Sequence, residues 1–257
     1  MIRIILFTTM LLASIIANGQ VSENRTVTNF SKIKVAQGIE LYFTQSESYS
    51  LKVETDDLEK MQYVKTVVEG TTLNVYIETQ KSVVKKVKKW SNNLNFKVLK
   101  VYVSAPMVAD FKASSSGSIS LQNELKVDKL NVAVSSSGDF LGTIKCKEAE
   151  FEVSSSGDIR VQLFADTVNV AASSSADVVL SGSANVLSVK ASSSADCDAR
   201  DLKVKTAAAV ASSSSKVLVN VSESLNAKAS SSADVYYYGT PKNVVADKSS
   251  SGSVTPR

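Results

Sequence analysis

Runs of three serines recur along the second half of the chain, and this repeat constrains the fold more than any other feature. The runs are separated by 21, 19, 19, 19, 20, 18 and 19 residues, and their first serines are Ser114, Ser135, Ser154, Ser173, Ser192, Ser212, Ser230 and Ser249. A small residue follows each run and an apolar residue comes two positions later, as in Gly138 and Phe140. A nearly constant period of this length is typical of a solenoid of stacked coils.

The residues before each run distinguish strand from helix. Apolar residues alternate with polar ones, as in Leu130, Val132 and Val134, and this is the period of a strand with one buried face. A repeat of about 19 residues is too short for a strand–helix–strand unit, which needs about 30. The sequence therefore predicts an all-β fold: a right-handed parallel β-helix whose coils stack about 4.8 Å apart, with two or three short strands per coil.

The same alternation, continued through each run, predicts where the serines point. It turns the middle serine of every run inward, and these are Ser115, Ser136, Ser155, Ser174, Ser193, Ser213, Ser231 and Ser250. We expect their hydroxyls to form a buried column that is hydrogen-bonded along the stack, because an unpaired buried hydroxyl costs about 1–3 kcal/mol. The small residue after each run is expected at a corner, where a larger side chain would crowd the next coil.

The first residues have the pattern of a secretory signal. Arg3 precedes an apolar run over residues 4–16, and small residues follow at 17–19, as signal peptidase requires. We expect residues 1–19 to be removed and the mature chain to be exported to the periplasm, the outer membrane or the cell exterior. The apolar run is too short to span a bilayer, and no transmembrane segment is expected in the mature chain.

Residues 20–107 carry strand patterns without serine runs. The candidate strands cover residues 33–35, 39–43, 50–53, 64–68, 73–77 and 99–103. We interpret this section as the N-terminal β cap and first coils of the solenoid, which hide the apolar end of the stack. A separate β-sandwich packed on the solenoid is the alternative. Residues 108–257 then form the β-helix proper.

Composition excludes several kinds of chemistry. The chain has no histidine, which removes Ser-His-Asp and Cys-His nucleophiles and most zinc sites. Its net charge of +4 is mild, and no basic helix or aromatic-basic motif indicates nucleic acid. We predict no catalytic residues, no cofactor and no metal.

One segment is strongly basic. Four lysines and a tryptophan form the candidate ligand-binding residues, namely Lys85, Lys86, Lys88, Lys89 and Trp90. They are typical of a patch for an anionic envelope polymer or for lipid phosphates. The alternative is a solvated excursion between two strands.

Three further features have a structural and a functional interpretation. An aspartate column is predicted at Asp139, Asp158, Asp177, Asp196 and Asp234. These carboxylates are turn acids bonded to backbone amides, ligands for calcium, or a pair for sugar hydrolysis. The tyrosines at 236–238 close the end of the core or offer a platform for sugar. The outward serine columns are similar to hydroxyl arrays that bind ice or crystalline polymers.

The two cysteines are predicted to remain free. Cys197 occupies an inward apolar position of the repeat, and Cys146 lies where other copies carry valine or alanine. Three coils separate them, or about 14 Å along the axis, whereas a disulfide needs Cα atoms within about 7 Å. We therefore expect two buried thiols.

Several segments together resemble a known family. They are FSKIKV at 30–35, GIELYFTQ at 38–45, TLNVYI at 72–77, VYVSAP at 101–106, the repeated SSGDI, and YGTPK at 238–242 with SGSV at 251–254. The chain resembles the putative auto-transporter adhesin, head GIN domain family over about residues 27–255. This resemblance implies an exported β-helix protein of Bacteroidota, without established catalytic residues.

Two functions from different classes follow. The first is a non-catalytic envelope or surface protein, whose rigid β-helix binds a glycan, matrix or surface-protein partner. The alternative is a polysaccharide-active lyase or hydrolase on a β-helix, which would need an open cleft with converging acidic and basic side chains. The oligomeric state is left open.

Overall fold

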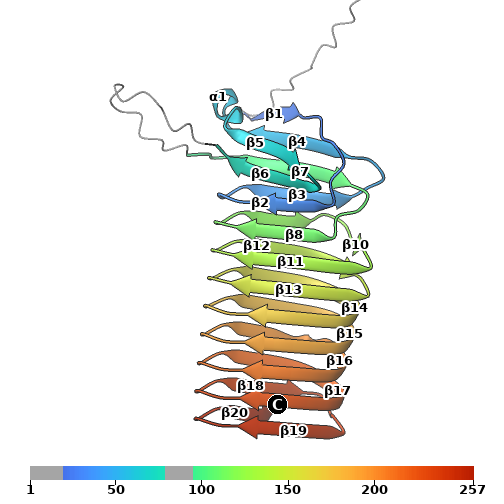
Figure 1. The fold of residues 1–257 in the computed structure, drawn as a ribbon, viewed down its shortest axis with the longest axis vertical. Coiled ribbons are helices and arrows are strands. Elements are labelled where there is room, and N and C mark those ends of the chain that lie inside the picture. The colour runs from blue at the N-terminus through green and yellow to red at the C-terminus, as the bar shows by residue number, and fades with distance from the viewer. Residues whose placement is uncertain (1–19, 79–94) are drawn as a thin grey trace, which may run out of the picture.

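The structure is a computed structural model that describes residues 20–78 and 95–257. Figure 1 shows the strands stacked coil upon coil into one long rod, with the N-terminal strands at one end and the C-terminus at the other. All strands belong to one continuous hydrogen-bonded sheet. In the part of the chain that is described, no helix is long and apolar enough to cross a membrane.

The N-terminal section contains seven strands and one short helix. They are β1 (Val21–Asn24), β2 (Lys32–Val35), β3 (Glu40–Gln45), β4 (Ser50–Thr55), α1 (Leu58–Met61), β5 (Val64–Glu69), β6 (Thr72–Ile77) and β7 (Leu99–Ala105). Strand β2 pairs in parallel with β6 on one side and with β8 (Asp110–Ser114) on the other, and β3 pairs in parallel with β7 and with β9 (Ser118–Leu121). Residues 32–45 therefore form a coil that lies between two coils made by later residues.

The outermost strands at this end pair antiparallel with their neighbours. Strand β4 pairs antiparallel with β7, β1 with β4, and β5 with β6. Gly70 turns the chain between β5 and β6 with φ +60°. These antiparallel strands cover the apolar end of the stack.

The serine repeat forms the rest of the rod. Its strands are β8 (Asp110–Ser114), β9 (Ser118–Leu121), β10 (Leu125–Lys126), β11 (Lys129–Ser135), β12 (Asp139–Lys145), β13 (Glu148–Ser154), β14 (Asp158–Ala172), β15 (Asp177–Ala191), β16 (Asp196–Ala211), β17 (Lys216–Ala229), β18 (Asp234–Tyr238), β19 (Asn243–Lys248) and β20 (Ser253–Pro256). Equivalent residues of successive coils pair in parallel, with Ser135 between Ser114 and Ser154. The predicted β-solenoid is confirmed.

Each coil consists of two opposed layers. We call the layer that follows a serine run the post-serine sheet and the layer that precedes the next run the pre-serine sheet. Strand β14 passes through both, because its first residues pair with β12 and its last residues with β13. The apolar side chains of both layers point between them, and Phe111, Phe140, Phe151 and Leu130 are all fully buried.

The prediction that the middle serines are buried is wrong. The second and third serines of every run are exposed, and both have positive φ, as in Ser174 at 56° and Ser175 at 59°. Two residues in the left-handed region form a tight turn of the type I′ kind. The strand alternation therefore ends at the first serine, and the next two project outward at the tip of the turn.

Backbone hydrogen bonds explain how this turn is held. The amide of the small residue donates to the carbonyl of the first serine, as from Gly157 to Ser154 at 3.1 Å. The amide of the third serine donates to the backbone carbonyl of the middle serine in the next coil, as from Ser156 to Ser174 at 3.0 Å. The small residue lies where a larger side chain would crowd a neighbouring coil, as expected: a Cβ added to Gly138 would lie 2.9 Å from backbone atoms of Ala113 in the previous coil.

Both cysteines are free, as predicted. Cys197 is fully buried and pairs in register with Val178 and Val217 of the adjacent coils. Cys146 is only partly buried, which corrects the expectation of two buried thiols. It lies at the bend between the two sheets, where the inward residue is less completely covered.

Replacing Cys197 by valine is expected to make stability less sensitive to alkaline pH. Burial raises the pKa of Cys197 from 9.0 to about 12. Between these values the unfolded chain releases a proton that the folded chain keeps, so stability falls as the pH rises, by up to about 1.4 kcal/mol per pH unit. Valine removes this proton and matches the neighbouring Val178 and Val217. Denaturant unfolding of parent and variant from pH 8 to about pH 11 measures the difference, and parallel curves would contradict it.

Candidate binding surfaces

The predicted basic patch lies outside the described residues. Lys85, Lys86, Lys88, Lys89 and Trp90 fall between β6 and β7, in the stretch 79–94. Their role as ligand-binding residues therefore stays a prediction.

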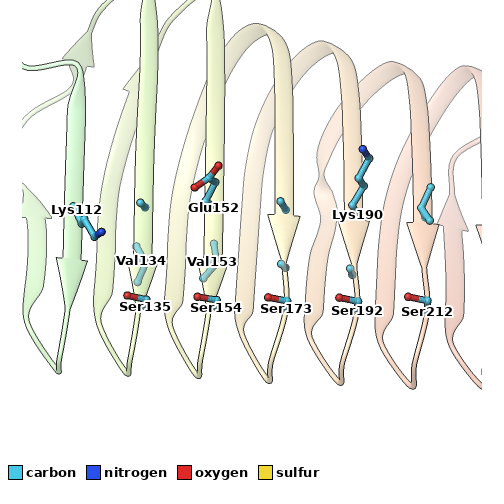
Figure 2. A pocket seen from close by; sticks show the side chains of 15 residues that line it. Lys112, Val134, Ser135, Glu152, Val153, Ser154, Ser173, Lys190, Ser192 and Ser212 are labelled. Atoms are coloured by element: carbon cyan, nitrogen blue, oxygen red, sulfur yellow. The ribbon is translucent and has the colours of Figure 1, made fainter.

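A shallow trough runs along the pre-serine sheet beside the serine turns. It encloses about 540 Å³ and crosses the coils from Lys112 to Val210. Figure 2 shows Ser135, Ser154, Ser173, Ser192 and Ser212 in a row along its edge, one per coil, with their hydroxyl oxygens pointing in the same direction. We call this the serine trough.

The composition of the trough follows from the coil register. Outward residues two positions before the first serine form a column in which Lys112, Glu152 and Lys190 alternate with Ala133 and Ala171. The alanines leave the floor low, whereas the long charged side chains rise from alternate coils (Figure 2). Sequence reasoning found the outward serines but not these neighbours, because their alignment depends on the register of each coil.

The row of first serines has hydroxyls available to a ligand. Within residues 20–78 and 95–257, none of the hydroxyls of Ser135, Ser154 or Ser173 forms a side-chain hydrogen bond. Ser215, which takes the place of the small residue after a run, behaves differently. It is buried, its hydroxyl donates to the Ala191 carbonyl at 3.0 Å, and it accepts from the Ser212 amide at 3.0 Å.

The aspartate column forms on the post-serine sheet as predicted. Asp139, Asp158, Asp177 and Asp196 pair in consecutive coils, and Lys216 separates Asp196 from Asp234. Burial together with the charges of Asp158 and Asp196 raises the pKa of Asp177. Among the residues whose placement is described, no three Asp, Glu, Cys or His side chains converge as a metal site.

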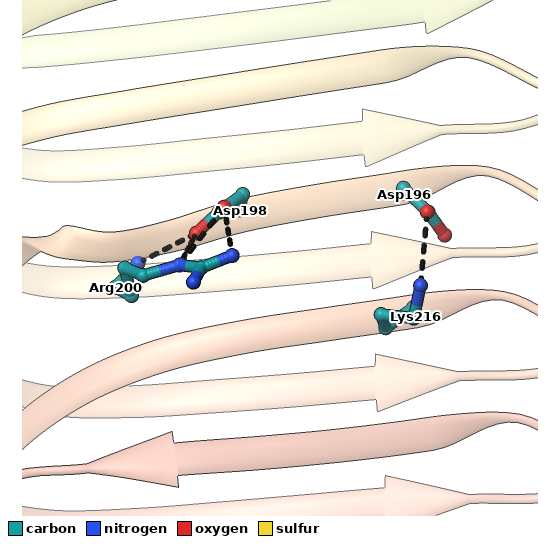
Figure 3. A network of polar contacts seen from close by, with 4 residues as sticks. All are labelled: Asp196, Asp198, Arg200 and Lys216. Carbon is teal, nitrogen blue, oxygen red and sulfur yellow. Dashed lines mark hydrogen bonds and ion pairs between the residues drawn. The ribbon is translucent and has the colours of Figure 1, made fainter.

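One ion pair lies at the end of this column, and a second pair lies beside it on the same sheet. Figure 3 shows Lys216 beside Asp196, with Nζ 3.4 Å from the carboxylate, and Arg200 folded back on Asp198. Arg200 donates from Nε and Nη2 to the two Asp198 oxygens at 2.9 and 2.6 Å. Burial favours a raised pKa for Asp198, but these hydrogen bonds outweigh it and hold the pKa below its usual range. The pairs are therefore structural contacts along the sheet.

The C-terminal tyrosines divide between core and surface. Tyr237 packs against the buried core, whereas Tyr236 faces outward and carries the Arg257 guanidinium 4.5 Å from its ring centroid. Because the outward ring is already occupied, the arrangement favours the closing of the core over an open platform for sugar.

A second tyrosine pair, not found from the sequence, lies at the other end of the same sheet. Tyr42 and Tyr102 stack with centroids 5.2 Å apart, and Lys52 Nζ lies 4.4 Å from the Tyr102 centroid. The hydrogen bond from Tyr42 to Glu40, with partial burial, raises the pKa of Tyr42 to about 12. Since the ring faces contact one another and a lysine, this cluster joins neighbouring strands.

The fold and its surfaces define an all-β solenoid with long, regular faces. The sequence model of the family described as "Putative auto-transporter adhesin, head GIN domain" matches residues 29–162 and 141–241 of this chain. The chain belongs to this family. A search of curated proteins finds no match.

Solved structures share the same architecture. A protein from Parabacteroides distasonis described as a putative lipid binding protein is 22% identical with a TM-score of 0.83, and 93% of this chain and 97% of that chain are covered. A putative adhesin from Parabacteroides merdae is 18% identical with the same TM-score and the same coverage. A putative adhesin from Bacteroides fragilis is 20% identical with a TM-score of 0.65, covering 94% of this chain and 98% of that one. These identities establish a common fold.

Proposed function

We propose that the protein is a non-catalytic, exported scaffold of the cell envelope or surface that binds a glycan along its serine trough. The observation that carries the proposal is the row of unpaired hydroxyls, one per coil, along a low floor. Consecutive hydroxyls lie about 4.8 Å apart, at the strand repeat. Each hydroxyl in such a row can exchange a hydrogen bond with a hydroxyl of an extended sugar chain. Each of these hydrogen bonds is weak, but many of them along one chain together raise the binding affinity.

The family and fold agree with this proposal at a coarser level. Head GIN domain proteins are named as adhesins, and two structural neighbours also carry that description. A rigid rod has little conformational entropy to lose when it binds a long partner. We propose that residues 1–19 direct export and that 20–107 form the cap of a solenoid spanning 108–257.

Filling the serine trough is expected to weaken glycan retention. Ala171→Trp places a large ring on the trough floor, and affinity for a retained glycan should fall at least about tenfold. Val179→Trp is the matched control, because Val179 is 40% exposed on the post-serine sheet. Retention of the mature protein on immobilised glycans, with assay for released sugars, measures both binding and catalysis.

Two results would contradict the proposal. Equal binding by the parent and by Ala171→Trp would place the ligand elsewhere. Release of shortened sugars by the parent would instead support the polysaccharide-active enzyme.

A further inference from the structure

A second groove lies at the bend where the post-serine sheet passes into the pre-serine sheet, on the edge of the rod away from the serine turns. It encloses about 790 Å³. Lys145 and Lys147, which flank Cys146, form one rim. Lys203 and Lys205, which flank Val204, lie three coils further along, and Asn220 and Ser222 of the next coil complete the lining on that side. We call it the corner groove.

The register sets the distance between the two lysine pairs. Lys145 is followed in successive coils by Phe164, Ser183 and Lys203. Three coil steps place the pairs about 14 Å apart along the rod axis. The first intervening coil carries the partly exposed Phe164 ring, and the second carries the small Ser183 and the buried Ala184, so the floor is lowest at the second coil.

The charge of the corner groove is strongly positive. Its lining contains four lysines and one acid, Asp166, which accepts a hydrogen bond from Asn185 at 3.0 Å. Lys147 pairs with the exposed Asp128 at 3.0 Å. In the described part of the chain, Lys145, Lys203 and Lys205 have no ion-pair partner. Neighbouring like charges without partners repel, and an anionic ligand would relieve that repulsion.

We propose that the corner groove binds an acidic polysaccharide, with carboxylates on separate sugars meeting the two lysine pairs. An extended polymer can meet both pairs at once, whereas a small anion meets only one. The hydroxyl of Ser183 and the amide of Asn185 lie between the pairs and can bond sugar hydroxyls. A membrane surface fits less well, because it would need a broad apolar area. Phe164, which is 38% exposed, is a single large apolar side chain among mostly polar and small lining residues. This site is separate from the serine trough and does not depend on it.

Removing one lysine pair tests the proposal. The double variant Lys203→Gln, Lys205→Gln is expected to bind polygalacturonate about two- to tenfold more weakly at low salt, because each lost contact between an exposed lysine and a carboxylate is individually weak. The control double variant Lys34→Gln, Lys248→Gln removes the same charge from exposed sites outside the groove and should change affinity less than about twofold. Ser183→Trp keeps the charge but fills the floor, and should also weaken binding.

The remaining arms separate other sources of affinity. Ala171→Trp fills the serine trough and leaves the corner groove unchanged. Loss of polygalacturonate binding in Ala171→Trp but not in Lys203→Gln, Lys205→Gln would place the acidic polymer in the serine trough and overturn the inference, so the two sites are told apart. The inference is overturned by equal losses in the two double variants, by an unchanged Ser183→Trp, or by no binding to polygalacturonate. It is also overturned if only replacement of Lys85, Lys86, Lys88 and Lys89 by Ser removes binding, or if the protein binds phosphatidylglycerol vesicles and not the polysaccharide.

Discussion

Phe140→Ala is expected to lower the free energy of unfolding by about 3–5 kcal/mol, because it leaves a cavity among fully buried aromatic rings. The Phe140 ring is fully buried, with its centroid 5.5 Å from that of Phe111, which in turn lies 5.3 Å from Phe43. This row of aromatic rings joins the N-terminal coils to the first coils of the serine repeat. The loss should therefore uncouple the two ends of the rod, and denaturant unfolding should show a lower midpoint.

The control is the same change at an exposed ring. Phe164 is 38% exposed, and Phe164→Ala should change the unfolding free energy by no more than about 0.5 kcal/mol. A Phe140→Ala variant as stable as Phe164→Ala would show that the aromatic row does not hold the coils together.

Ser174→Val is expected to destabilise the rod by about 1–2 kcal/mol, because Ser174 has φ 56°. A β-branched residue is strongly disfavoured in the left-handed region. The backbone cannot relax, since the Ser174 carbonyl accepts from the Ser156 amide in the previous coil. Ser174→Gly should act in the opposite direction and raise stability by less than about 1 kcal/mol, because relief of the strain is partly offset by the greater freedom of glycine in the unfolded chain.

Ser173→Val is the matched control one residue earlier. Ser173 is half-buried at the end of the strand and its φ is negative, so valine should be tolerated within about 0.5 kcal/mol. Thermal and denaturant unfolding of the three variants measure the order. Equal stability of Ser173→Val and Ser174→Val would mean that the turn is not constrained as the structure shows it.

The turn is also where sequence reasoning failed. Strict alternation described Leu130, Val132 and Val134 correctly, because strand geometry forces neighbouring side chains to opposite faces. The predicted alternation continues through Ser135 to Ser136. In the structure φ becomes positive at Ser136, so the strand has already ended there. Glycine and asparagine are the residues that indicate such a turn, and a serine triplet carries no equivalent signal. The hydroxyls therefore line the outside of the rod.

The order of the first coils could not be predicted from the sequence either. The strand pattern at residues 32–45 was correctly predicted, but its coil lies between β6–β7 and β8–β9. Pairing between strands far apart in the chain depends on which exposed edges remain free after folding, and no local pattern records that. The corner groove was missed for a related reason, since Lys145 and Lys203 become neighbours of one groove only through the register of the intervening coils.

The sequence by itself determined that the chain stacks in-register coils of about 19 residues, with alternate side chains inside and both cysteines apart. These properties follow from the period of the serine runs and from the two-residue repeat of a strand, which act locally. Only the tertiary structure decided which way the serines face, how the first coils are ordered, and which charged residues meet at the trough and the groove. Those depend on left-handed backbone angles and on register across coils, and both arise from hydrogen bonds between residues distant in the chain.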